Sequence, residues 1–280
     1  MNEAPALTGR SAIVTGASRG IGAAIAHRFA AEGASVALVA RTASPGGKLP
    51  GSLQETADAI RSAGGNCTMI EANLADPADV ARIVPATVEA FGGVDILVNN
   101  AAWSRFVPIW EATAKHFQLA FQMNVFTPQA LCSDALPHMR TKGAGWILNI
   151  SSATADTPPP APWDLEDRYI RYNHEGHATL YGASKAALDR LTAGWALELA
   201  GSQIAVNALA PVGAVASEGA LAVGGWDERD HIEPVETMVE AALVLCSRAP
   251  GSLTGEVVRS QPLLKRLGVE VRDLHGKPLR

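Results

Sequence analysis

Apolar and polar positions follow two alternating rhythms along this chain. Short, largely apolar runs occur at residues 11–14 (SAIV), 36–40 (VALVA), 95–98 (DILV), 146–150 (WILNI) and 205–209 (AVNAL). Longer segments between them repeat apolar residues with the period of a helix, as at residues 21–33, 53–65, 78–93 and 178–199. Strands that alternate with helices predict right-handed crossovers and a parallel sheet covered on both faces. The expected fold class is α/β, a doubly wound (Rossmann) parallel sheet.

We expect residues 1–280 to form a single domain. No Pro/Gly/Ser linker divides the chain, and 48% hydrophobic with 18% charged residues is typical of a globular protein. Two segments interrupt the rhythm, at about residues 156–179 and 212–233. Ligands of such sheets lie outside the carboxyl ends of the strands, so the residues that follow the apolar runs should line one crevice.

Charge and cysteine content narrow the classes of partner. A net charge of −5 offers no broad attraction to nucleic acid or to an anionic membrane surface. The three cysteines are far apart and lack the paired spacing of a zinc site or a disulfide framework, so we expect buried thiols and no metal. No run of about 18 apolar residues occurs, which predicts a cytoplasmic protein without a membrane partner.

A glycine-rich run, TGASRGIG at residues 15–22, follows the first predicted strand and opens a helix. Gly16, Gly20 and Gly22 allow a tight turn and a close approach to a pyrophosphate, whose charge the helix N-terminus favours. The strand before the run and the helix after it make a dinucleotide site the preferred interpretation.

The residues after the second strand bear on the choice of dinucleotide. A free ribose 2′-hydroxyl usually meets a carboxylate, whereas a 2′-phosphate needs positive charge and donors. Ala40, Arg41 and Thr42 stand there without an acid, and Arg19 supplies a second guanidinium. We therefore expect NADP(H) to be preferred, with NAD(H) as the alternative.

Several motifs in the same order resemble those of the short-chain dehydrogenases/reductases. These motifs are TGASRGIG, NNAA at residues 99–102, Asn124 in the long helical stretch, NISS at residues 149–152 and YGASK at residues 181–185. The resemblance implies cofactor contacts from Gly16, Ser18, Arg19, Gly20, Ile21, Gly22, Arg41, Thr42, Asn73, Leu74, Asn100, Ala101, Tyr181, Lys185, Pro211 and Val212.

Tyr181 and Lys185 lie one helical turn apart, which points to proton transfer. Reduction of a carbonyl needs a hydride on carbon and a proton on oxygen, supplied by a group within hydrogen-bond reach. A free phenol has a pKa near 10, and we expect the ammonium of Lys185 to lower the pKa of Tyr181. The resemblance implies that Lys185 also holds the nicotinamide ribose, that Ser152 polarises the carbonyl, and that Asn124 anchors a water. Ser151 is the alternative active hydroxyl.

The chain also departs from the family pattern. The stretch between Ser152 and Tyr181 is longer by roughly sixteen residues. Trp163, Tyr169 and Tyr172 could give this insertion an apolar wall at the substrate mouth, or it could contact another subunit or decorate the surface. Residues 212–233 should form the substrate lid, with Trp226 able to close over a ligand. The tail at residues 263–280 could reach across an oligomer.

These features predict an NADP-dependent oxidoreductase that acts on a secondary alcohol or the corresponding ketone. The suspected pocket segments show no cluster of arginines, so the expected substrate is apolar or moderately polar. A dimer or tetramer of identical subunits is expected from the resemblance. The alternatives are an NADPH-binding sensor without turnover, and a lyase or isomerase on the same fold.

Overall fold

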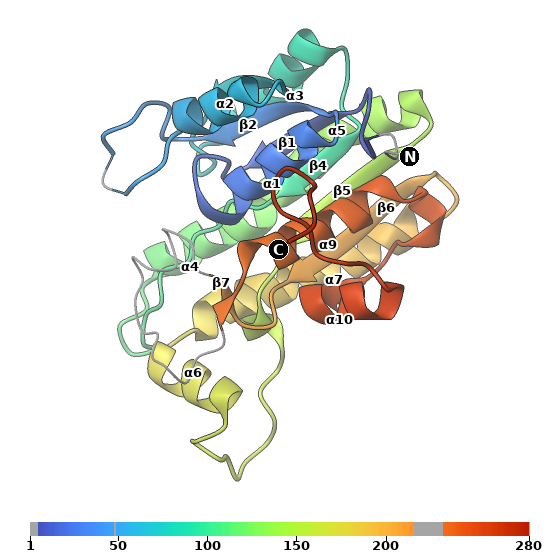
Figure 1. Ribbon diagram of the computed structural model, residues 1–280. Coiled ribbons are helices and arrows are strands. Elements are labelled where there is room, and N and C mark those ends of the chain that lie inside the picture. The colour runs from blue at the N-terminus through green and yellow to red at the C-terminus, as the bar shows by residue number, and fades with distance from the viewer. Residues whose placement is uncertain (1–4, 48, 216–231, 280) are drawn as a thin grey trace.

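A computed structural model of the protein describes residues 5–47, 49–215 and 232–279. Seven parallel strands form the central sheet, in the order β3-β2-β1-β4-β5-β6-β9 (Figure 1). In chain order these are β1 (Ser11–Thr15), β2 (Ser35–Ala40), β3 (Asn66–Glu71), β4 (Ile96–Asn99), β5 (Gly145–Ile150), β6 (Ile204–Ala210) and β9 (Val257–Arg259). The predicted doubly wound fold is confirmed. The direction of winding reverses between β1 and β4, where such sheets bind ligands.

Helices cover both faces of the sheet and enclose two apolar cores. One face packs against α1 (Gly20–Ala31), α2 (Leu53–Ser62), α9 (Val235–Ser247) and α10 (Ser260–Leu267). The other packs against α3 (Pro77–Phe91), α5 (Thr127–Lys142) and α7 (Thr179–Glu198). Strands β1, β5 and β6 are buried along their whole length because both faces are covered, which explains their continuous apolar runs.

Local sequence signals set several helix boundaries. The side chain of Asp76 caps α3 by accepting a 2.9 Å hydrogen bond from the backbone N–H of Ala78, and Pro77 occupies the first turn. Gly92 ends the same helix in the left-handed region, at φ 79°. Helix α4 (Ala114–Phe121) runs through a π turn at Gln122–Phe126 into α5, and Asn124 lies in that turn.

The stretch between β5 and α7 begins with a short 3₁₀ turn (Ala153–Ala155), and the inserted segment that follows contains helix α6 (Arg168–Gly176). Strand β7 (Ala214–Val215) pairs in parallel with β8 (Ile232–Glu233). Figure 1 shows α6 at the end of the molecule where α4 and β7 also lie, past the ends of the strands of the central sheet. Most of the predicted lid, with Trp226, lies outside the described residues.

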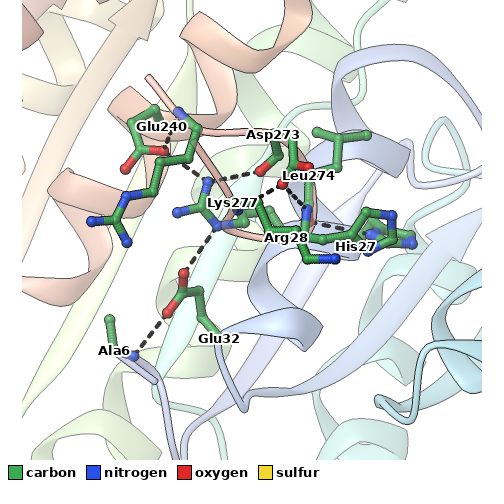
Figure 2. A network of polar contacts seen from close by, with 10 residues as sticks. Ala6, His27, Arg28, Glu32, Glu240, Asp273, Leu274 and Lys277 are labelled. Carbon is green, nitrogen blue, oxygen red and sulfur yellow. Dashed lines mark hydrogen bonds and ion pairs between the residues drawn. The ribbon is translucent and has the colours of Figure 1, made fainter. Parts of the chain in front are cut away.

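The C-terminal tail folds back onto its own chain (Figure 2). Arg28 of α1 is fully buried and donates to Glu32 at 3.0 Å, to Glu240 of α9 at 2.7 Å and to the carbonyl of Asp273 in the tail at 3.2 Å. The His27 and His275 rings meet edge to face with centroids 4.8 Å apart. The described tail therefore joins α1 to α9, and its predicted reach across an oligomer stays a prediction.

The described ranges show neither a membrane span nor a metal-binding cluster. None of their helices combines the length and the apolar character needed to cross a bilayer. No group of three or more His, Cys, Asp or Glu residues in those ranges is placed to hold a metal ion.

Candidate active site

One cleft of about 710 Å³ runs along the carboxyl ends of the strands. It gathers most of the residues predicted for the site: Gly16, Ser18, Arg19, Gly20, Ile21, Gly22, Arg41, Thr42, Leu74, Asn100, Ala101, Ser152, Tyr181, Lys185, Pro211 and Val212. Asn73 is exposed and does not line the cleft, although its neighbour Leu74 does. Asn124 is buried beneath the wall.

The glycine loop at the N-terminus of α1 fits a dinucleotide pyrophosphate. Gly16 has a φ of 69°, and a Cβ atom there would lie 2.8 Å from the Asn100 side chain. A Cβ atom on Gly22 would lie 2.3 Å from the carbonyl oxygen of Gly16. Arg19, the residue before the helix, gives no side-chain cap, so the first N–H groups of α1 remain available to an anion.

The two arginines of the cofactor prediction have different surroundings. Arg19 donates from Nε to the carbonyl of Pro50 at 2.7 Å and from Nη2 to those of Leu49 at 3.3 Å and Gly51 at 2.7 Å. Its guanidinium thus holds the loop between β2 and α2. Arg41 is exposed and makes no hydrogen bond or ion pair with any residue that the structure describes.

The segment after β4 is pinned to the end of β1. The Asn100 side chain donates to the carbonyl of Thr15 at 2.8 Å, and its backbone N–H donates to the Thr15 hydroxyl at 3.0 Å. The backbone N–H of Ala101 also reaches that hydroxyl, at 3.1 Å. These bonds form the floor of the cleft between β1 and β4, where the direction of winding of the sheet reverses.

Asn124 connects two walls of the site. Its Oδ1 accepts from the backbone N–H of Trp103 at 2.8 Å, and its Nδ2 donates to the Trp103 carbonyl at 3.0 Å and to the Ser184 hydroxyl at 2.9 Å. The side chain therefore fixes the loop after β4 against α7. Its predicted role of anchoring a water beside Lys185 stays a prediction.

The two candidate serines after β5 face different partners. The Ser152 hydroxyl lines the cleft and lies close enough to Tyr181 for a hydrogen bond that lowers the tyrosine's pKa. Ser152 also accepts from the Thr154 hydroxyl at 2.9 Å. Ser151 also lines the cleft, but it is buried, and its influence is on the pKa of Asp189 rather than on that of Tyr181. This arrangement favours Ser152 as the hydroxyl that meets a substrate.

Burial dominates the electrostatics of Tyr181. It raises the pKa of Tyr181 to about 12, and the hydrogen bond with Ser152 only partly opposes this. The expectation that Lys185 would lower the pKa of Tyr181 is not met. The Lys185 ammonium lies 5.8 Å from the centre of the Tyr181 ring and donates instead to the carbonyl of Ile150 at 2.6 Å.

Lys185 is itself strongly perturbed. Its side chain is only 1% exposed, and burial lowers its pKa to about 8 despite the opposing attraction of Asp189. Asp189 follows one turn later on α7, and its own pKa is raised by burial although Ser151 and Lys185 oppose that shift. Sequence reasoning missed Asp189, yet its i,i+4 spacing from Lys185 was a usable signal.

The loop after β6 is held from below by a buried carboxylate. Glu233 is fully buried and accepts a 2.7 Å hydrogen bond from the backbone N–H of Val212 and another from the Ser260 hydroxyl. The cleft segment at Val212 is thereby tied to β8 and to the start of α10.

The inserted segment forms one end of the cleft. Asp156, Arg168, Tyr169 and Tyr172 line it, which favours the rim interpretation over surface decoration. The expectation for Trp163 is wrong, because this side chain is 57% exposed and donates to the carbonyl of Pro159 outside the cleft. Phe106, in the loop after β4, adds a ring to the wall.

The structure brings two arginines to the substrate end of the cleft, although the sequence showed no cluster of arginines in the suspected pocket segments. Arg168 opens α6 and Arg259 ends β9, and both line the cleft. Arg259 forms an ion pair with Asp156. Sequence reasoning missed Arg259 although it is the last residue of a strand, at the carboxyl edge of the sheet where ligand contacts are expected.

Comparisons with known proteins agree with this geometry. The family model described as short chain dehydrogenase matches residues 10–162 and 172–223. Hydroxysteroid dehydrogenase-like protein 2 of Danio rerio is 33% identical over 277 residues, which cover 98% of this chain and 63% of that protein. The chain thus spans less than two thirds of that relative.

Solved structures with bound cofactors are similar in sequence and fold. A short chain dehydrogenase from Burkholderia cenocepacia in complex with NADP is 30% identical, with a TM-score of 0.76 over 90% of this chain and 96% of that one. A 7α-hydroxysteroid dehydrogenase complexed with NADH and 7-oxo glycochenodeoxycholic acid is 27% identical, with a TM-score of 0.78 over 92% and 96%. A nicotinamide dinucleotide is therefore the cofactor class that these similarities support.

Proposed function

We propose, from the premise that this chain belongs to the short-chain dehydrogenase family of oxidoreductases, that it transfers a hydride between NADP(H) and a secondary alcohol or the corresponding ketone. One observation carries the proposal. The hydroxyls of Ser152 and Tyr181 and the buried ammonium of Lys185 meet in the same cleft as the glycine loop. The nicotinamide, when bound, supplies or accepts the hydride.

The chain's own residues handle the proton and orient the carbonyl. With a pKa of about 12, Tyr181 keeps its proton near neutral pH, which is the form that donates to the oxygen of a ketone during reduction. The Ser152 hydroxyl, adjacent to that phenol, is placed to hydrogen-bond the same oxygen. Lys185 stays largely charged below pH 8, the form that can donate a hydrogen bond to a hydroxyl of the nicotinamide ribose.

Replacing Tyr181 with Phe tests the mechanism. This change removes the proton donor and retains the ring, so ketone reduction should fall by at least the 10²–10⁴-fold typical of a lost general acid. Dinucleotide affinity should change little, because the glycine loop is untouched. Absorbance in the NADPH band measures turnover and fluorescence titration measures binding. Turnover that survives in the variant would contradict the proposal. If the wild type binds NADPH tightly but reduces no ketone, the result would favour the alternative of a sensor without turnover.

The NADP preference rests on Arg41. Of the two predicted arginines, it is the one whose exposed side chain no described residue contacts by a hydrogen bond or ion pair. Its neighbours in the sequence are Ala40 and Thr42, so the end of the second strand has no carboxylate to meet a 2′-hydroxyl. Arg19 instead holds backbone carbonyls, so we assign it a positioning role at the adenosine end.

Replacing Arg41 with Ala should weaken NADPH binding by roughly 1.5–3 kcal/mol, the value of a charge-assisted hydrogen bond, and leave NADH affinity nearly constant. Arg19→Ala is the matched comparison, because freeing the loop should weaken both dinucleotides to a similar extent. Titration of each variant with each dinucleotide measures the four affinities. Equal losses for Arg41→Ala with both cofactors would exclude a 2′-phosphate role.

The assembly and location of the protein belong to the same proposal. We propose a cytoplasmic dimer or tetramer of identical chains, supported by three buried free thiols and by exposed apolar side chains such as Phe117, Phe126 and Leu197. Light scattering coupled to gel filtration measures the mass of the particle.

A further inference from the structure

Positive charge dominates the lining of the cleft. Among the described residues that line it, five are basic (Arg19, Arg41, Arg168, Lys185 and Arg259) and one, Asp156, is acidic. The whole chain carries a net charge of −5, so this bias is local. A cleft lined by one sign of charge concentrates ligands of the opposite sign.

Two of these basic residues lie at the end of the cleft away from the adenosine site. Arg259 is the last residue of β9, its side chain is 23% exposed, and its Nη2 pairs with Oδ2 of Asp156. Arg168 is the first residue of α6, and its Nη2 donates to the carbonyl of Val212 at 3.2 Å. In these contacts each guanidinium uses one nitrogen of three, so both retain donors for a ligand.

A series of aromatic rings leads from Tyr181 to helix α6, which begins at Arg168. The ring of Phe106 lies 5.5 Å from that of Tyr181 and meets the Tyr172 ring edge to face at 6.0 Å, measured between centroids. A flat or apolar body can pack on these rings while its carbonyl meets the Tyr181 hydroxyl. Its far end would then face Arg168 and Arg259.

Asp156 indicates which anion suits this end of the cleft. A carboxylate already pairs with Arg259, and the Asp156 side chain is 63% exposed, so a ligand can replace it at little cost in desolvation. Planar carboxylates and guanidinium groups match in geometry.

Building on the proposed function, we propose that the substrate is a keto acid or the corresponding hydroxy acid. Its apolar body packs against Phe106 and Tyr172, and its carboxylate binds Arg259 and Arg168. The carboxylate takes no part in the reaction, in which the ketone carbon gains a hydride and the ketone oxygen gains the Tyr181 proton. By binding the two arginines, the carboxylate sets the position of the ketone relative to Tyr181.

Matched acid and ester probes test this assignment. The probes are benzoylpropionate, benzoylbutyrate and their methyl esters, with turnover followed as loss of NADPH absorbance. In the wild type kcat/KM for the better acid should exceed that for its ester by about 10- to 100-fold, the effect of a charge-assisted contact. Arg259→Gln should abolish most of this ratio, and Arg168→Gln part of it. Equal kcat/KM for acid and ester in the wild type would overturn the assignment.

Two further variants separate recognition from a structural role. Asp156→Asn frees the Arg259 guanidinium, so the acid-to-ester ratio should stay the same or rise. If the ion pair merely pins the insertion, Asp156→Asn and Arg259→Gln should lower turnover of acid and ester alike, which would contradict the inference. Arg266→Gln is the control. Arg266 lies on α10 outside the cleft and pairs with Glu256 at 2.8 Å, so its replacement should leave the acid-to-ester ratio constant.

Thermal stabilisation by benzoylpropionate gives a readout that needs no turnover. Stabilisation of the wild type but not of Arg259→Gln, with no ketone reduced, would support the carboxylate site and refute the proposed reaction. Reduction of esters as readily as acids, without stabilisation by the acid, would leave the proposed reaction standing and refute the carboxylate site.

Discussion

A buried lysine at the centre of the site shows what catalytic geometry costs in stability. The Lys185 ammonium has lost its hydration and has one hydrogen bond of 2.6 Å, to the carbonyl of Ile150. A fall in pKa from 10.5 to about 8 corresponds to about 3 kcal/mol of unfavourable burial at neutral pH. We interpret this as stability given up for a charge beside Tyr181.

Replacing Lys185 with Met should therefore raise the free energy of unfolding at pH 7 by roughly 2 kcal/mol, after about 1 kcal/mol is subtracted for the lost hydrogen bond. Between pH 8 and 10.5 the unfolded wild type binds more protons than the folded form, so wild-type stability rises with pH there and the gain from Met should shrink. Urea unfolding at pH 7 and pH 10 measures both effects. Lys185→Arg, which cannot shed its charge, should destabilise at both values, and a Met variant less stable than wild type at pH 7 would contradict the account.

The packing of whole elements decides where the reactive hydroxyls lie. Helix α7 carries Tyr181, and the 3₁₀ turn after β5 follows Ser152. They approach so closely at Gly182 that a Cβ atom there would lie 2.3 Å from the carbonyl oxygen of Thr154. Gly182 has an ordinary helical conformation, so its φ does not require glycine. Glycine is needed here because the two backbones approach so closely.

Gly182→Ala should push α7 away from the turn and separate Tyr181 from Ser152. We expect turnover to fall by at least tenfold and the free energy of unfolding by about 1–3 kcal/mol, the usual cost of overpacking. Gly194→Ala on the same helix is the matched control, because its Cβ would meet only the flexible end of Arg190, at 3.0 Å. It should retain activity and gain about 0.5–1 kcal/mol from helix propensity. Equal behaviour of the two variants in kinetics and denaturation would refute the packing argument.

At the scale of the whole molecule, the tail joins the two helices α1 and α9 through Arg28 (Figure 2). The guanidinium is 1% exposed and Glu240 is 6% exposed, so removal of either partner leaves a buried charge short of a partner.

Arg28→Met should lower the free energy of unfolding by roughly 3 kcal/mol, and the double change Arg28→Met with Glu240→Met should recover much of that loss. Thermal and urea unfolding of the two single variants and the double variant complete the cycle. The exposed pair of Arg82 and Asp79, 58% and 30% exposed, is the control, and Arg82→Met should cost less than about 1 kcal/mol. Additive losses in the Arg28 cycle would contradict a coupled network.

The local sequence was enough to predict the sheet, the glycine loop and the spacing of Tyr181 and Lys185. Each of these depends on a short-range period or on the rule that ligands meet the carboxyl ends of parallel strands. That rule also placed Ser152, Asn100 and Val212 at one edge, and the cleft contains all three.

Other properties were decided only by tertiary structure, because they depend on burial and on partners far apart in the chain. The spacing of Tyr181 and Lys185 does not reveal how deeply the phenol is buried. Desolvation raises the pKa of Tyr181, opposite to the expected direction. Arg19 found the carbonyls of a loop thirty-odd residues away, and Arg259 met Asp156 across 103 positions. A side chain's neighbours follow from how the elements pack, so sequence alone could name the reactive groups but not the charge around them.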